Sequence, residues 1–167
     1  MAGYYSGKLY RALNPIYARE SLSGEGARRY GGRFNPKGLP ALYCSLSIMT
    51  AVREANQVGT LQPTMLVAYE AELDGIFDAT VEANLIVEGL DAAIIRAPTW
   101  RDEMKATGEA RTQAFARSLI AKGCRGLLVP SFAPGASRRD MNMVLWQWGS
   151  AAPGRLTLID DEGRLST

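Results

Sequence analysis

Arg33, Tyr43 and Glu54 place a cation, an aromatic ring and a carboxylate within one short stretch of the chain. Arginine presents a planar set of donors that suits bidentate binding of phosphate. A tyrosine ring stacks on flat heterocycles, and a carboxylate stabilises the oxocarbenium-like charge of glycosyl transfer. Together the three residues suit a ligand with an anionic group, a flat ring and a site of developing positive charge.

Each of these residues also has an ordinary structural interpretation. Arg33 could bond backbone carbonyls in a turn, and Tyr43 could be a core residue with a satisfied hydroxyl. Glu54 could be a solvated helix residue that pairs with Arg53 or Lys37. The residue types alone therefore leave both interpretations open.

The same stretch predicts the elements that position these side chains. Gly31 and Gly32 allow close backbone approach just before Arg33, and residues 35–38 (NPKG) predict a tight turn. Residues 41–45 (ALYCS) predict a short buried strand. Ser45 or Ser47 can cap the following helix, in which Glu54 lies about two turns from the start. The helix is expected to bury Ile48, Ala51, Val52 and Ala55, with Glu54 at the edge of that face.

Other segments predict further strands and helices. Tyr10 and Arg11 fall on opposite faces of a first strand, because side chains alternate along a strand. Asp74 and Gly75 are expected to end the strand over 64–73, and Gly89 a short helix within 81–90. Thr99 is a candidate N-cap. The expected strands are 8–13, 41–45, 64–73, 125–131, 141–148 and 156–159, and the clearest helix is 109–122. This mixture lacks a βαβ rhythm and predicts an α+β fold with a mainly antiparallel sheet.

Composition narrows the class of protein. The 167 residues predict a single domain over 1–167, and the net charge of +2 does not favour direct nucleic-acid binding. The absence of histidine removes histidine-based triads and histidine-ligated metals. Neither a signal peptide nor a span of about 20 apolar residues is evident. We therefore expect a cytoplasmic protein with no membrane association and no metal. The role of Cys44 and the structure of residues 74–100 stay open.

Three further residues are candidates for the site. Ser131 follows Val129 and Pro130 at a strand end, and without a histidine to activate it a hydrogen-bonding role is expected rather than nucleophilic attack. Arg11, on a neighbouring strand, is a second candidate cation, although a salt-bridged sheet residue is its simpler interpretation. Asn35, in the turn after Arg33, is included among the expected substrate contacts.

An ordered series of segments resembles one known family. GGRFNPKG (31–38), ALYCS (41–45) and Glu54 resemble the start of the RES domain, the toxin half of a RES/Xre-type bacterial toxin–antitoxin pair. The pair Tyr10-Arg11, the segment 112–131 (TQAFARSLIAKGCRGLLVPS), Gly135 and the strand 141–146 (MNMVLW) continue the series. The likeness runs with gaps from about residue 9 to residue 148.

The resemblance implies a function and roles for residues. RES domains resemble ADP-ribosyltransferase folds, which implies a split sheet with flanking helices. They consume NAD, by hydrolysis, phosphorolysis or transfer of ADP-ribose to a protein. Arg33, Glu54 and Ser131 match the family's named residues, and Tyr43 matches a tyrosine between the first two. Phe34 stands where tryptophan is frequent, a change of packing more than of chemistry. The family also implies an antitoxin with a DNA-binding domain.

The favoured hypothesis is transfer of ADP-ribose from NAD to a protein acceptor, with Glu54, Arg33 and Tyr43 catalytic. In this hypothesis Arg33, Tyr43, Ser131, Arg11 and Asn35 bind NAD. The first alternative is an NAD-degrading glycohydrolase or phosphorylase. An alternative of another class is a non-catalytic module that binds phosphate or nucleic acid through Arg33 and its neighbours, and it predicts binding without nicotinamide release.

Overall fold

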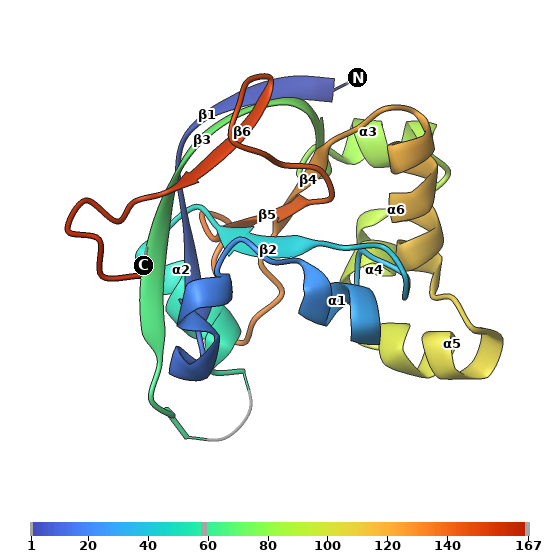
Figure 1. Cartoon of the computed structure of the whole chain (residues 1–167). Helices are drawn as coiled ribbons and strands as arrows, with labels where there is room; N and C mark the ends of the chain where they lie inside the picture. The colour runs from blue at the N-terminus through green and yellow to red at the C-terminus, as the bar shows by residue number, and fades with distance from the viewer. Residues whose placement is uncertain (1, 58–59, 166–167) are drawn as a thin grey trace.

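The computed structural model describes residues 2–57 and 60–165 (Figure 1). Its strands are β1 (Ala2–Leu13), β2 (Leu42–Ser45), β3 (Met65–Asp78), β4 (Gly126–Pro130), β5 (Met141–Leu145) and β6 (Gly154–Leu158). Its α-helices are α1 (Glu25–Tyr30), α2 (Ile48–Ala55), α3 (Glu82–Val87), α4 (Ala92–Arg96), α5 (Trp100–Thr107) and α6 (Arg111–Ala121), and a 3-10 helix, η1, covers Pro15–Glu20. The predicted α+β class is confirmed.

The strands form one six-stranded sheet in the order β1-β2-β5-β4-β3-β6, and β1 also pairs with β3. This additional pairing closes β1, β2, β5, β4 and β3 into a barrel-like ring, and β6 pairs with β3 ahead of β4, on the edge of β3 opposite β1. All pairings between these strands are antiparallel except β3 with β4. The prediction of a mainly antiparallel sheet is therefore correct. The prediction of a split sheet is wrong, because the long β1–β3 ribbon joins the two edges.

The turn predicted at Asp74-Gly75 is also wrong. β3 continues through both residues to Asp78. Its pairing passes from β6, whose first residue lies opposite Leu73, to β4, whose first residue lies opposite Ile76. Gly75 has φ of +68°, and its carbonyl accepts a hydrogen bond from the Arg125 N–H at 2.7 Å. Gly75 thus bends a continuous strand so that it can change partners.

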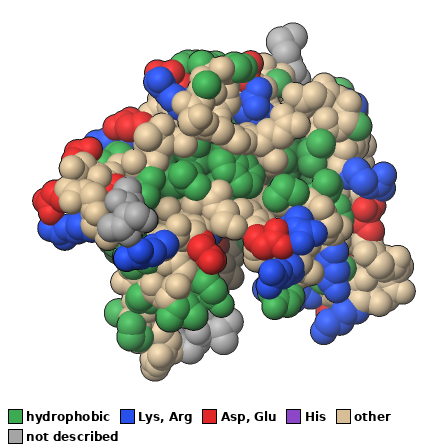
Figure 2. All heavy atoms as spheres, viewed as in Figure 1, with side chains coloured by type: hydrophobic (Ala, Val, Ile, Leu, Met, Phe, Trp, Pro, Cys, Tyr) green, Lys and Arg blue, Asp and Glu red, His purple; other side chains and the backbone are tan. Residues whose placement is uncertain are grey.

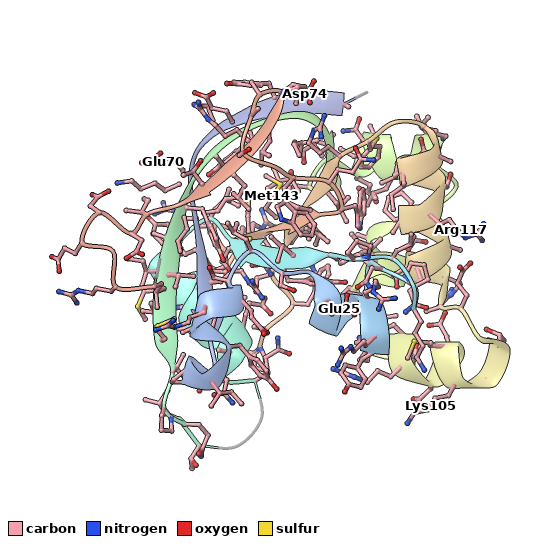
Figure 3. All side chains as sticks on the ribbon, viewed as in Figure 1. Glu25, Glu70, Asp74, Lys105, Arg117 and Met143 are labelled. Atoms are coloured by element: carbon pink, nitrogen blue, oxygen red, sulfur yellow. The ribbon has the colours of Figure 1, made fainter. Side chains whose placement is uncertain are left out.

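Two hydrophobic clusters lie on the two faces of the sheet. Alternate residues of β5, Met143 and Leu145, join the cluster inside the ring, and fully buried Met143 lies near the centre of the molecule (Figure 3). Val144 faces the other way, into a cluster with Phe115 and Leu119 of α6. Figure 1 shows α3, α4, α5 and α6 grouped on one side of the sheet, away from η1 and α2.

Helix α2 begins as predicted but buries a different face. Ser47 is its N-cap, and the Ser47 hydroxyl accepts from the Thr50 N–H at 3.1 Å. Thr50 and Ala51 are its buried residues, whereas Ile48, expected to be inside, is 48% exposed. Because residues i+3 and i+4 share a helix face, Glu54 follows Ala51 and Thr50 onto the inward side rather than its edge.

Most other local predictions are confirmed within about two residues. The first strand reaches further back, to Ala2, and α3 is the predicted short helix. α5 starts after Thr99, and α6 ends shortly before Gly123. α4 was not predicted. In the described parts of the chain, every helix is too short or too polar to cross a membrane.

Candidate functional site

A cavity of about 310 Å³ lies between α2 and α5 on the outer face of the sheet. Its floor comes from β2, β4 and β5, which contribute Tyr43, Val129, Asn142 and Val144. Its two sides carry opposite charges, Glu54 from α2 and Arg101 from the start of α5. Arg33 and the turn before it complete the wall. Segments far apart in the sequence therefore meet around one space.

Glu54 is held in this cavity by three neutral donors. Its Oε1 accepts from the Ser131 hydroxyl and from the Asn142 side-chain amide, the latter at 2.6 Å. Its Oε2 accepts from the Gln57 amide at 2.6 Å. The ordinary interpretation, pairing with Arg53 or Lys37, does not hold. Hydrogen bonds from neutral groups thus orient the carboxylate, and it forms no ion pair with the residues that the structure describes.

Arg33 lies half-buried beside this carboxylate. Its Nη1 donates to the carbonyls of Ile95 at 3.2 Å and Ala97 at 2.8 Å, at the end of α4. Its guanidinium lies 4.9 Å from the centre of the Phe132 ring. Burial lowers the pKa of Arg33, Glu54 counteracts that effect, and the nearby positive charge of Arg101 adds to it. Only Nη1 of its three nitrogens bonds within the described residues, so Nε and Nη2 are available to an anion.

The Tyr43 hydroxyl supports the turn that carries Arg33. It donates to the Asn35 Oδ1 at 2.6 Å and accepts from the Phe34 N–H at 3.0 Å. Burial raises the pKa of this hydroxyl, which favours the neutral donor. A Cβ at Gly32 would lie 2.6 Å from Asn35 Oδ1, so the close approach requires glycine. The Tyr43 ring lines the cavity, and its predicted stacking role stays a prediction.

Asn35 belongs to the scaffold of this turn. It is 0% exposed, and its amide nitrogen donates to the carbonyls of Ala27 at 2.8 Å and Leu39 at 2.9 Å. Gln113 of α6, equally buried, donates to the carbonyls of Gly32 and Asn35. This placement gives no support to the predicted contact between Asn35 and substrate, because its side chain already bonds within the protein.

Ser131 reaches the site from the end of β4. It is 9% exposed, and its N–H donates to the Asp140 carbonyl at 2.8 Å. Its hydroxyl also accepts from the Ala133 N–H at 3.3 Å. The structure thus brings Ser131 to Glu54, although they are far apart in the sequence, and gives its hydroxyl the role of a donor to the carboxylate.

The structure does not bring Arg11 to this site. Arg11 shares a strand face with Leu9, which is buried inside the ring, and its Nη1 donates to the Ser21 carbonyl at 2.8 Å. It lines a separate cavity of about 510 Å³ between η1 and α1. Figure 2 shows an indentation at the lower edge of the molecule between these two elements. The prediction that Arg11 contacts the same ligand as Arg33 is therefore corrected.

Asn142 is a site residue that was not predicted from the sequence. Asn142 bonds Glu54, and its Oδ1 accepts from the Ser45 hydroxyl at 2.7 Å. It was expected only as part of an apolar strand. A polar residue between Met141 and Met143 was a usable signal, because alternation turns it away from the buried face. Phe132, beneath Arg33, was missed as well and has no comparable signal.

Comparisons with known proteins identify the family of the chain. The family model described as the RES domain matches residues 8–166. The chain therefore belongs to the RES domain family, which confirms the resemblance predicted from 9–148. It is also similar to a protein of Photorhabdus laumondii subsp. laumondii named Toxin Res, with 44% identity over 46 residues. That match covers 28% of this chain and 30% of the relative, so the chain aligns with under a third of that protein.

Proposed function

We propose that this protein cleaves the bond between nicotinamide and ribose in NAD and transfers ADP-ribose to a protein acceptor. The observation that carries the proposal is the meeting of Glu54 and Arg33 at one cavity, where the donors to Glu54 among residues 2–57 and 60–165 are all neutral side chains. Membership of the RES domain family supports the same proposal.

Glu54 would act at the ribose carbon C1′. As the C–N bond breaks, its electron pair leaves with nicotinamide, which becomes neutral, and positive charge develops on the ribose. A carboxylate oriented toward that carbon stabilises the charge. Ser131 and Asn142 hold Oε1 in place while this happens. Because the leaving group already carries positive charge in NAD, the step requires no general acid.

Arg33 would bind the anionic part of the substrate. Its two nitrogens without partners suit the oxygens of a pyrophosphate. The Tyr43 ring, on the floor of the same cavity, would stack against nicotinamide. The acceptor then attacks C1′ and gives up a proton, so that water yields free ADP-ribose, phosphate yields ADP-ribose 1″-phosphate, and a protein side chain yields a modified protein.

The biological role we propose is that of an intracellular, cytoplasmic toxin with a cognate antitoxin. The relative named Toxin Res supports this role. The antitoxin is expected to carry a DNA-binding domain and to block the cavity near Arg33. In cells, expression of the protein should deplete NAD or modify a target, and co-expression of the antitoxin should restore growth.

The test is nicotinamide release from NAD by the purified protein, with and without a bacterial lysate. Labelled ADP-ribose retained on one protein band, with release that depends on lysate, is the expected result. Release without lysate would instead identify a glycohydrolase, or a phosphorylase if phosphate were required. Absence of release in both conditions, despite binding of NAD, would replace the proposal with a non-catalytic binding module.

A further inference from the structure

A second and larger cavity adjoins the one that Glu54 lines. It has a volume of about 1010 Å³, against about 310 Å³ for the smaller one. The two share Arg33, Pro130 and Phe132 as walls, but Glu54 lines only the smaller cavity. A ligand that occupies both must therefore pass the Arg33 guanidinium at its middle.

The larger cavity has a cationic lining. Arg33, Arg96 and Arg138 line it, against a single carboxylate, that of Glu82. Arg96 is the last residue of α4, and Arg138 lies in the loop between β4 and β5. Within the part of the chain that the structure describes, neither has an ion pair or a side-chain hydrogen bond. Their charges are therefore available to an anionic ligand.

A second observation points to an anion near the shared wall. Arg101 lies close enough to Arg33 for its charge to lower the pKa of the Arg33 guanidinium. Two like charges held near one another repel, and an anion bound beside them offsets that repulsion. A negatively charged centre of a ligand at the partition would therefore meet Arg33 and Arg101 together, with the Glu54 carboxylate on the side of the smaller cavity.

We infer that the larger cavity binds the ADP half of the dinucleotide, with its pyrophosphate against Arg33 and its adenosine side between Arg96 and Arg138. The inference rests on the proposed function and names the half of the substrate that each cavity takes. A dinucleotide carries its negative charges between two ring-bearing ends, which matches cavities joined at a cationic wall. The opposite orientation would place the reacting ribose carbon away from Glu54.

The experiment measures by calorimetry the binding of ADP to the wild-type protein and to two double variants. ADP is the probe because it has no nicotinamide bond to break. The double variant Arg96→Gln/Arg138→Gln should weaken ADP binding about tenfold or more, because charge-assisted hydrogen bonds are lost. The matched control is Lys105→Gln/Arg139→Gln, which removes the same net charge outside the lining of either cavity. Lys105 projects from the outer side of α5 (Figure 3).

Equal ADP affinity in the two double variants, or no ADP binding to the wild type, would overturn the inference. The outcome is separable from that of the proposed function. If the Arg96→Gln/Arg138→Gln variant cleaves NAD with an unchanged KM, the proposed ADP site is refuted and the proposed activity is supported. If that variant alone loses ADP binding and the wild type cleaves no NAD, the ADP site is supported and the proposed activity is refuted. Both arginines are exposed, so thermal unfolding of the variant should match that of the control.

Discussion

Two carboxylates beside α2, those of Asp140 and Glu54, have opposite surroundings. Asp140 is 7% exposed and accepts from the Thr50 hydroxyl at 2.6 Å and from the Arg53 guanidinium at 2.8 Å. The Ser137 N–H donates to its other oxygen at 2.7 Å. Hydrogen bonds from Thr50 and Ser137, together with the charge of Arg53, lower the pKa of Asp140. Glu54 faces a cavity, and its hydrogen-bond donors within the described part of the chain are uncharged side chains.

The difference indicates that Asp140 has a structural role and that Glu54 is available for the reaction. The charge of Asp140 is compensated by Arg53, so this carboxylate fixes α2 from the loop before β5. Glu54 lies one turn after Thr50, the residue that Asp140 anchors. Among the described residues Glu54 forms no ion pair, and Arg33 acts on it only across the cavity that both line, so its charge can respond to positive charge that develops there. One carboxylate thus positions the helix that presents the other.

Replacement of Glu54 should give the largest effect on activity. Glu54→Gln keeps the size of the side chain but removes its charge, and we expect nicotinamide release to fall about 10²–10³-fold. Asp140→Asn is the matched change at the other carboxylate and should lower thermal stability more than the rate per folded molecule. Equal loss of kcat in both variants, with both folded, would contradict the distinction between them.

Asn142→Ala should have the next largest effect. It removes one of the two donors to Glu54 Oε1, and imprecise placement of the carboxylate should lower kcat about 10- to 100-fold with little change in KM. Ser45→Ala tests the next residue outward, because Ser45 bonds Asn142 rather than Glu54. Steady-state kinetics should show a smaller loss for Ser45→Ala, and the reverse order would argue against this chain of support.

Thr50→Val should mainly affect stability. Thr50 is 1% exposed, and valine keeps its shape but leaves the Asp140 carboxylate without one donor. We expect a loss of about 1.5–3 kcal/mol in the free energy of unfolding. Denaturant titration measures it, and Thr157→Val, at an exposed position of β6, is the control. An equally small effect in both variants would show that the Asp140 network contributes little.

The smallest expected effect is the pH dependence of that stability. The folded state holds the pKa of Asp140 below its ordinary value, so its contribution is present above about pH 4. The contribution is lost as the pH falls through the lowered pKa of the folded state. The stability difference between wild type and Asp140→Asn should therefore shrink as the pH falls below about pH 4. Denaturant titrations across this range measure it, and a constant difference would contradict the assignment.

The sequence was informative wherever one short segment decides its own structure. Ser47 was an expected cap and is the N-cap of α2, because capping depends on neighbouring backbone donors. Tyr10 and Arg11 were placed on opposite strand faces by alternation alone. Gly123 was expected to stop the best helix, and α6 ends two residues before it.

Local signals failed where a distant partner decides the outcome. Asp74-Gly75 has turn chemistry, yet β3 continues because β4 supplies a new neighbour for the strand. The pairing of β1 with β3 closed a sheet that the sequence predicted as split. The face of α2 was misjudged because Thr50, a polar residue, is buried by its bond to Asp140.

The candidate site divides in the same way. The sequence itself determined the family series and the individual residues Arg33, Tyr43, Glu54 and Ser131, because these lie in recognisable local segments. Only the tertiary structure decided that Ser131 and Asn142 meet at Glu54, that Arg11 faces another cavity and that Asn35 is internal. The physical reason is that each of these outcomes depends on hydrogen bonds and packing between residues far apart in the chain. A single sequence does not encode such contacts in any one window.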